Sequence, residues 1–144
     1  MCALNEVKGM NLIMINIYNE LKKLNKKVDS NDIPVSCIIV KNGKILAKAI
    51  NNKYKNLNPL GHAEINAIIK ASKKLNTTNL NDCELYVTLK PCKMCQEIIQ
   101  EVRIKKVYYF VENTKNINNT VIYKKIEFDN NFDTEIINFF KNKR

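Results

Sequence analysis

The stretch LYVTLKPCKMC, residues 85–95, joins an apolar run to two cysteines that lie three positions apart. Residues 83–89 contain aromatic and β-branched side chains, which favours a strand. Pro91 is tolerated in the first turn of a helix, so a helix is predicted over 92–102. KVYYFV, residues 106–111, predicts the next strand. A strand–helix–strand order implies two parallel strands with the helix covering their sheet.

The rest of the chain supplies the other layers of this fold. Asn42-Gly43, a strong hairpin signal, joins two apolar runs, and apolar residues at helical spacing predict further helices. These elements are helices over 11–24, 62–75 and 132–143 and hairpin strands over 35–40 and 44–50. We therefore expect a three-layer α/β/α sandwich with a mixed central sheet. The 144 residues are enough for one domain with its own core.

The composition indicates a globular protein with an excess of positive charge. The 24 Lys and Arg residues outnumber the 14 Asp and Glu residues, which gives a net charge of +10. This charge is consistent with attraction to a polyanion such as RNA. The lysines are spread along the chain rather than clustered, so a compositional bias explains them equally well.

Membrane insertion and secretion are not expected from this sequence. No apolar run approaches the roughly 20 residues that a membrane helix needs. The first residues show no charged-then-apolar signal pattern. The cysteines number five, and an odd count argues against a disulfide framework and favours reduced thiols. We expect a cytoplasmic protein with no membrane partner.

One histidine and two cysteines form a candidate metal site. His62 begins one predicted helix, with Glu64 two residues later, and Cys92 and Cys95 begin another. In the expected layout both helix N-termini emerge near the same edge of the sheet, so the imidazole and the two thiolates could converge there. This set of ligands suits Zn²⁺. A helix N-terminus also lowers the pKa of a thiol, which favours the thiolates.

The number of ligands bears on whether this zinc is structural or catalytic. A structural zinc site has four protein ligands, and here the motif supplies three. A fourth would have to be Cys2, Cys37 or Cys83, and the last two fall in strand-like runs that predict a buried core. An open fourth position would hold water, whose pKa zinc lowers to about 7. Glu64 could then carry a proton without binding the metal.

Each part of this site has a simpler interpretation when taken alone. A C-x-x-C pair after a strand is also typical of thioredoxin-like redox sites. A histidine at the start of a helix is commonly a polar residue near a cap, and a glutamate such as Glu64 is commonly solvated. The combination of H-x-E with P-C-x-x-C favours the metal site over these separate explanations.

These motifs resemble those of a known family. HAE (62–64) with PCKMC (91–95) is similar to the signature of the zinc-dependent nucleoside and nucleobase deaminase superfamily. Within it, DIPVSCIIVKNGKILAKAIN (32–51) and RIKKVYY (103–109) most resemble the bacterial tRNA-specific adenosine deaminases. The resemblance extends over about residues 10–112. It implies a cytidine deaminase-like fold for one zinc-dependent deaminase domain, residues 1–144.

The resemblance also implies roles for individual residues. Zinc would be bound by His62, Cys92 and Cys95, and Glu64 would shuttle protons. Two substrate contacts are implied as well, a hydrogen bond from Asn51 to the target base and one from the backbone N–H of Ala63 to its reacting edge. Asn51 has a second interpretation, since an asparagine in an Asn-rich loop can simply make a turn.

The substrate implied by the resemblance is adenosine at the wobble position of a tRNA anticodon loop, converted to inosine by a homodimer. A deaminase of a free cytosine or guanine nucleoside, nucleobase or nucleotide is the alternative within enzymes. A non-catalytic, zinc-stabilised RNA-binding module is the alternative from another class. Glu64 argues against this module, because a structural zinc site needs no proton carrier.

The sequence departs from the tRNA enzymes at three places. Lys90 stands where they typically carry Glu, which changes the charge next to the metal motif. Gln96, Glu97 and Ile98 stand where they have very small residues. The segment 112–120 is shorter than the corresponding loop and helix of those enzymes.

The region after this segment, TVIYKKIEF (120–128), has two interpretations. As a strand, it would pair antiparallel with 106–111, as in deaminases of free nucleosides, because a parallel crossover takes a dozen or more residues. As a remnant helix over TVIYKK, it would preserve the layout of the tRNA enzymes without their last strand.

Overall fold

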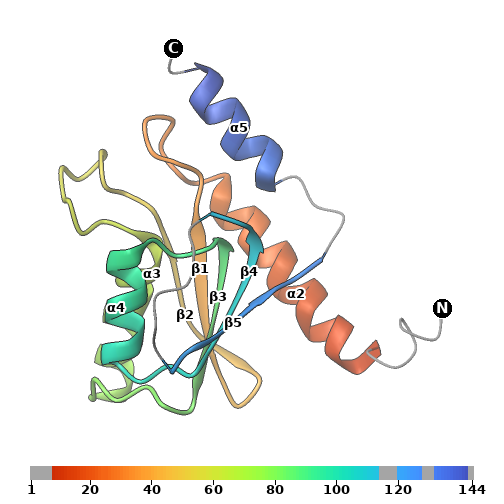
Figure 1. Cartoon of the computed structure of the whole chain (residues 1–144), viewed down its shortest axis with the longest axis vertical. Helices are drawn as coiled ribbons and strands as arrows, with labels where there is room; N and C mark the ends of the chain where they lie inside the picture. Colours follow the sequence, from red (N-terminus) through yellow and green to blue (C-terminus); the bar gives the residue numbers. More distant parts are fainter. Residues whose placement is uncertain (1–7, 114–119, 128–131, 143–144) are drawn as a thin grey trace.

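Five strands form one mixed sheet in the order β2-β1-β3-β4-β5 (Figure 1). The computed structural model describes residues 8–113, 120–127 and 132–142, with side chains from residue 12 to residue 141 of these ranges. Its strands are β1 (Ser36–Lys41), β2 (Lys44–Ile50), β3 (Cys83–Leu89), β4 (Lys106–Val111) and β5 (Ile122–Lys125). Its helices are α2 (Lys8–Asn25), α3 (Ala63–Leu75), α4 (Lys93–Glu101) and α5 (Phe132–Asn142).

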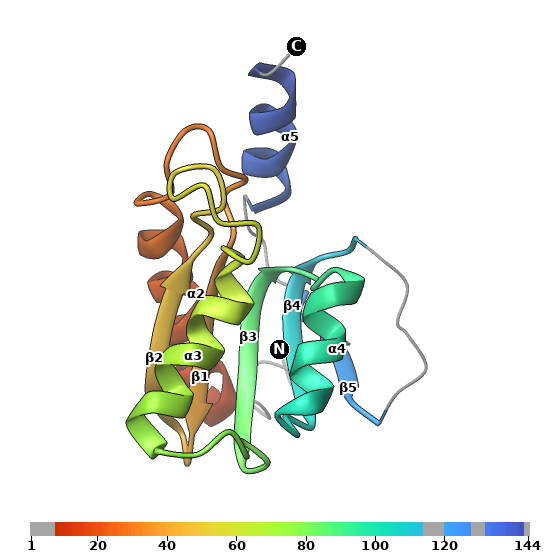
Figure 2. The ribbon, with the colours of Figure 1, turned by 90° about the vertical axis from the view of Figure 1, so that its left-hand side faces the viewer.

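The helices lie on both faces of the sheet, which confirms the predicted three-layer sandwich. Figure 2 shows α3 and α4 side by side on one face, with α2 on the other. Two buried apolar clusters match these faces. Ala67, Val87 and Val107 belong to the cluster under α3 and α4. Leu21 and Phe132, from α2 and α5, belong to the cluster on the opposite face. No helix in the described part of the chain is both long and apolar enough to span a membrane.

The hairpin and the strand–helix–strand unit form as the sequence predicts. Asn42 and Gly43 both have positive φ angles, 53° and 75°, as expected for the two central residues of a type I′ turn. β1 pairs antiparallel with both β2 and β3. β3 and β4 are parallel, with Leu85 opposite Val107. The sheet is therefore mixed, and its parallel β3–β4 pair is joined through α4.

The final strand corrects both interpretations of residues 120–128. β5 is a strand, and it pairs parallel with β4, with Tyr108 opposite Lys124. Ten residues, 112–121, connect the two strands. An extended chain of this length reaches about 33 Å, which exceeds the roughly 20 Å length of a six-residue strand. The antiparallel pairing was predicted from the rule that a parallel crossover takes a dozen or more residues. This rule describes crossovers that contain a helix, so it wrongly excluded parallel pairing of β4 and β5.

Lysines from α3 cover part of one sheet edge. The Lys70 ammonium donates to the carbonyl of Lys48 at 2.8 Å, and the Lys74 ammonium donates to the carbonyl of Leu46 at 2.7 Å. Both carbonyls belong to β2, the strand at the end of the sheet.

Some predicted features fall outside the described residues. They are Cys2, most of the 112–120 segment and the last two residues of the chain.

Candidate metal centre and adjoining cavity

The N-terminus of α3 places the imidazole of His62 beside the sheet. His62 is the N-cap residue, with extended backbone angles (φ −86°, ψ 144°), and its ring makes no capping hydrogen bond. Gly61 precedes it, where an added Cβ would lie 2.6 Å from Asn52 Oδ1 and 2.9 Å from the Lys53 backbone. A larger residue at position 61 would therefore clash with the loop that leads into the helix. The glycine thus allows Asn52 and Lys53 to lie close to the residue that precedes α3.

The N-terminus of α4 places the two cysteines opposite this ring. Cys92 is the N-cap residue of α4, and Cys95 is buried in its first turn. The Nδ1 atom of His62 lies 3.8 Å from Cys92 Sγ and 3.5 Å from Cys95 Sγ. All three ligand atoms lie within 4.8 Å of one another.

The spacing of these atoms fits a zinc ion. Zn–N bonds of about 2.05 Å and Zn–S bonds of about 2.3 Å at a tetrahedral angle separate N and S by about 3.6 Å. The two observed N···S distances, 3.5 and 3.8 Å, bracket this value. The predicted convergence of His62, Cys92 and Cys95 is therefore present in the structure.

The remaining described cysteines lie elsewhere. Cys37 and Cys83 are buried in the apolar cluster under α3 and α4, as the strand pattern predicts. Within the described residues, the group of side chains that could hold a metal consists of His62, Cys92 and Cys95.

The two thiols titrate differently in the metal-free protein. Hydrogen bonds from Cys95 and His62 lower the pKa of Cys92 to about 4. The pKa of Cys95 is raised, because it donates to Cys92 and is buried. The hydrogen bond to Cys92 also raises the pKa of His62. The contacts within the cluster therefore favour the thiolate form at Cys92 over that at Cys95.

Glu64 lies in the first turn of α3, two residues from His62, with 4% of its surface exposed. Burial raises the pKa of its carboxyl group to about 7. A carboxyl group with a pKa near the working pH can both accept and donate a proton. Its position beside the cluster therefore suits the proton carrier predicted from H-x-E.

A cavity of about 140 Å³ adjoins the cluster. It is lined by His62, Ala63, Glu64, Cys92 and Asn51, all of which the sequence singled out, and by Ile33, Val35, Leu89, Lys90 and Asn113. Ligand sites for drug-sized molecules occupy roughly 300–1,000 Å³, so this space suits one small ring system.

Asn51 lines this cavity but also has partners in its own loop. Its Nδ2 atom donates to the carbonyl of Ile33 at 3.1 Å, and its Oδ1 atom accepts the N–H of Lys53 at 3.4 Å. Both interpretations of Asn51, a base contact and a turn, therefore remain predictions.

A profile described as "Cytidine and deoxycytidylate deaminase zinc-binding region" matches residues 14–111. These residues make up more than half of the chain and contain the whole His-Cys-Cys cluster. The chain belongs to this family. Its cofactor is the zinc ion for which the family is described, and the ligand spacing of the cluster fits that ion.

Relatives of this family member include enzymes for different substrates. A tRNA-specific adenosine deaminase of Aquifex aeolicus is 43% identical over 89 residues, which cover 62% of this chain and 59% of the relative. One from Rickettsia felis is 40% identical over 97 residues, or 66% of this chain and 67% of the relative. A guanine deaminase of Bacillus subtilis is 40% identical over 98 residues, or 65% of this chain and 63% of the relative. The match therefore spans about three-fifths to two-thirds of these relatives.

Solved structures support the cytidine deaminase-like fold. A structure from a study of A-to-I editing by tRNA:A34 deaminases superposes with a TM-score of 0.67 at 22% identity, covering 81% of this chain and 98% of that one. The Bacillus subtilis guanine deaminase structure superposes with a TM-score of 0.54 at 28% identity, covering 76% of this chain and 80% of that one.

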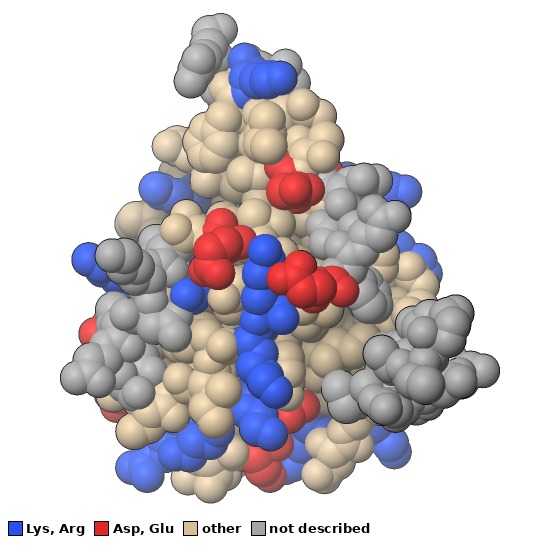
Figure 3. All heavy atoms as spheres, turned by 45° about the vertical axis from the view of Figure 1, so that its right-hand side comes forward, with Lys and Arg blue, Asp and Glu red and all other residues tan. Residues whose placement is uncertain are grey.

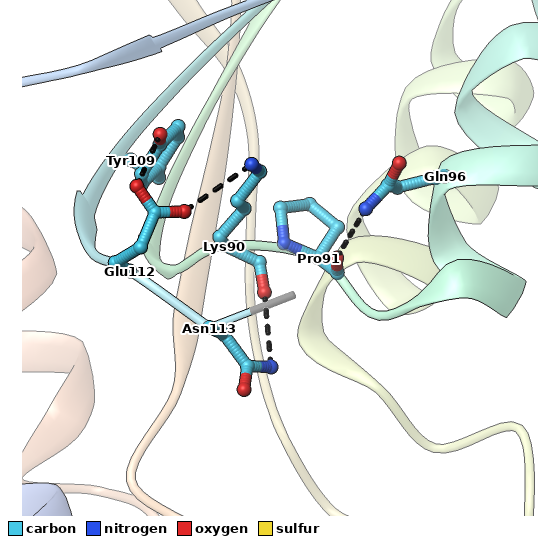
Figure 4. A network of polar contacts seen from close by, with 6 residues as sticks. All are labelled: Lys90, Pro91, Gln96, Tyr109, Glu112 and Asn113. Atoms are coloured by element: carbon cyan, nitrogen blue, oxygen red, sulfur yellow. Dashed lines mark hydrogen bonds and ion pairs between the residues drawn. The ribbon is translucent and has the colours of Figure 1, made fainter. Parts of the chain in front are cut away.

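A polar network lies beside the metal motif of this protein (Figure 4). The sequence did not predict this network. The Lys90 side chain, with 7% of its surface exposed, pairs with Glu112 at 3.2 Å. Its ammonium lies 5.2 Å from the ring centre of Tyr109 and 5.8 Å from that of Tyr123. The charge of Lys90, predicted to alter the surroundings of the metal, is therefore balanced by a carboxylate and two aromatic rings.

The same network includes cavity and helix residues. The amide of Asn113, on the cavity wall, donates to the Lys90 carbonyl at 3.5 Å. Gln96, which replaces a small residue, donates to the Pro91 carbonyl at 2.9 Å. In the sequence, the ion pair of Lys90 with Glu112 was indicated by one feature, a basic residue at a position that is typically acidic in the tRNA enzymes.

Proposed function

We propose that this protein is a zinc-dependent hydrolytic deaminase that converts adenosine to inosine at the wobble position of a tRNA anticodon loop. The observation that carries the reaction class is the arrangement of three ligand atoms within 4.8 Å of one another, with buried Glu64 on the wall of the same cavity. A three-ligand zinc site is typical of catalysis, whereas a structural site has four protein ligands.

The residues of the cavity have distinct roles in this proposal. His62 Nδ1 and the thiolates of Cys92 and Cys95 would hold zinc, which would supply an activated water at neutral pH. The carboxyl group of Glu64, on the cavity wall, would accept a proton and deliver it to the amine that leaves as ammonia. Asn51 and the backbone N–H of Ala63 hold the edge of the target base.

The preference for a base in tRNA is supported by the names of the relatives. A space of about 140 Å³ suits one base, which must leave its stack before it can react. The net charge of +10 is compatible with RNA binding. Figure 3 nevertheless shows a column of Lys and Arg side chains flanked by Asp and Glu on one face, so positive charge does not form a broad patch there.

The proposal includes a homodimer. Leu57, Leu60 and Tyr54 lie in the loop that leads to His62, with exposed fractions of 87%, 51% and 58%. Exposed apolar groups gathered beside a site favour a protein interface. Sedimentation of the zinc-loaded protein should give twice the chain mass, and a concentration-independent monomer would contradict this part. The proposal also includes a cytoplasmic location, where tRNA is found and thiols stay reduced.

A deaminase of free guanine is the second candidate. The Bacillus subtilis guanine deaminase is nearly as similar in sequence as the tRNA enzymes are. The guanine deaminase and the tRNA enzymes each match this chain over only part of their own length. Because the identity in the matched region is similar, this region does not distinguish the two substrates.

One experiment distinguishes these candidates. The zinc-loaded protein is incubated with an anticodon stem-loop that carries a wobble adenosine and, separately, with adenosine, cytidine, deoxycytidylate and guanine. Ammonia and the product base are measured, with Glu64→Gln as the inactive control. Inosine formed in the stem-loop alone supports the proposal, and turnover of a free compound with an inert stem-loop overturns the tRNA substrate. Inactivity on every compound, with zinc bound, would favour the non-catalytic RNA-binding module.

A further inference from the structure

Gln96 is a fully buried polar residue beside a metal ligand. None of its surface is exposed, and it follows Cys95 directly in α4. Burial of an amide is costly unless the group is hydrogen-bonded. The Nε2 atom of Gln96 donates to the Pro91 carbonyl at 2.9 Å (Figure 4). This carbonyl lies just before the helix, outside the ladder of hydrogen bonds within α4.

The backbone of Gln96 makes a second bond to the same turn. Its N–H donates to the carbonyl of Cys92, also at 2.9 Å. The Pro91 carbonyl belongs to the peptide group before the Cys92 α-carbon, and the Cys92 carbonyl belongs to the one after it. Gln96 therefore holds both peptide groups that flank this α-carbon, one through its side chain and one through its main chain.

This arrangement affects the geometry of the metal centre. The two peptide planes set φ and ψ of Cys92, which are −69° and 172°. These angles set the direction of the Cα–Cβ bond that carries the sulfur, relative to α4, the helix that also carries Cys95. The Cys92 sulfur itself contacts Cys95 and His62, so Gln96 acts on the peptide groups and not on the sulfur. A rotation of the Pro91–Cys92 peptide would move one sulfur and leave the other in place.

We propose that Gln96 is a positioning residue that aligns the Cys92 thiolate with Cys95 and His62 before the metal binds. It acts through the Pro91 carbonyl and touches neither metal nor substrate. Loss of the partners that orient metal ligands typically weakens metal binding about 10–100-fold. The inference rests on the metal site but not on the identity of the substrate.

The test uses the full chain and measures zinc affinity by competition with a chromophoric chelator. Gln96→Met keeps the length of the side chain but cannot donate, and Gln100→Met on the exposed side of α4 is the matched control. We expect Gln96→Met to bind zinc about 10–100-fold more weakly than the wild type, with Gln100→Met unchanged. The absorption bands of the Co²⁺-loaded protein should shift in Gln96→Met, because the thiolate angles change.

A second variant separates positioning from simple filling of space. Gln96→Glu has nearly the same shape, but its carboxyl group can donate to Pro91 only while it is protonated. The ratio of wild-type to Gln96→Glu zinc affinity should therefore grow as pH rises through the pKa of this carboxyl, whereas the ratio for Gln96→Met stays constant.

Two outcomes would overturn the proposal. One is a zinc affinity within about twofold of the wild type in both variants, with lowered thermal stability of the metal-free protein, which would show a purely structural role. The other is a Gln96→Glu ratio that does not depend on pH. If Gln96→Met fails to fold, the pH profile of Gln96→Glu still decides the question.

Discussion

The helices α3 and α4 each begin with a candidate metal ligand at the N-cap, yet they hold it in different ways. α3 packs closely on β1 and β2 through Ala63, Ala67 and Ala71, which have no exposed surface. Polar side chains farther along α3 also donate to β2, from Asn66, Lys70 and Lys74. The α4 ligand turn is held by polar contacts, from Gln96 to Pro91 and from Asn113 to Lys90. Errors in packing should therefore disturb His62 and Glu64, while lost hydrogen bonds should disturb the cysteines.

The largest effect is expected from removal of a ligand on either helix. His62→Ala and Cys95→Ala should each lose zinc and, with it, deamination, because two protein ligands remain. Cys83→Ala is the control, since Cys83 is buried but lies outside the cluster. Metal content and product formation are measured on the purified proteins. Full zinc occupancy in Cys95→Ala would remove this cysteine from the ligand set.

On α3, the variant Glu64→Gln separates the loss of proton transfer from the loss of metal binding. We expect zinc to stay bound and turnover to fall about 10²–10⁴-fold, the usual contribution of general acid–base catalysis. Glu97→Gln, an exposed position on α4, should change neither quantity. Loss of zinc in Glu64→Gln would instead identify Glu64 as a ligand.

The raised pKa of Glu64 predicts a pH dependence of stability in the metal-free protein. Its carboxyl pKa is about 7 in the folded state, against 4.5 for a glutamate in water. Between these pH values the folded protein holds a proton on Glu64 that the unfolded chain has lost. The stabilisation of the folded state by this proton is therefore complete below pH 4.5 and is lost as pH rises through 7.

Relative to Glu64→Gln, the wild type should lose about 3 kcal/mol of unfolding free energy from pH 4.5 to above pH 7. Urea unfolding of both metal-free proteins at several pH values measures this difference. A difference that is the same at pH 5 and pH 8 would argue against a buried, protonated carboxyl group.

A larger side chain between α3 and the sheet should disturb the packing that positions α3. Ala67→Leu adds volume where α3 meets the sheet and should cost about 1–3 kcal/mol of unfolding free energy. Because the displaced helix carries Glu64, activity should fall more than zinc content does. Lys73→Leu, on the exposed surface of α3, is the control. Unchanged stability in Ala67→Leu would show that α3 can move away from the sheet without penalty.

The smallest effect concerns the ion pair beside α4. Glu112→Gln should cost about 1 kcal/mol or less, because the Glu112 side chain is 56% exposed and solvent screens the pair. The double variant Lys90→Glu with Glu112→Lys should recover part of what Lys90→Glu alone loses. Thermal unfolding of the wild type, Lys90→Glu, Glu112→Lys and the double variant gives the coupling energy. Additive effects would mean that the pair contributes no interaction energy of its own.

The parts of this molecule that depend on local signals were predictable. Asn42-Gly43 specified the hairpin, and the H-x-E and P-C-x-x-C motifs specified which side chains meet at the helix N-termini. The direction of β5 was predicted wrongly, because loop length alone does not decide how a chain returns to a sheet. The bonds of Gln96 and Lys90 were missed, since each joins positions whose proximity depends on the complete fold.

The lysines of α3 that bind the β2 carbonyls have a consequence for solubility during folding. An open sheet edge is a template on which another chain can add a strand, and this is a common route to aggregation. On β2, the ammonium groups of Lys70 and Lys74 already occupy the Lys48 and Leu46 carbonyls. The opposite edge strand, β5, is only four residues long and carries Lys124 and Lys125. The β2 edge thus has lysines on its carbonyls, and the β5 edge is short and charged. Both features disfavour the addition of a strand from another chain, and so the growth of fibres.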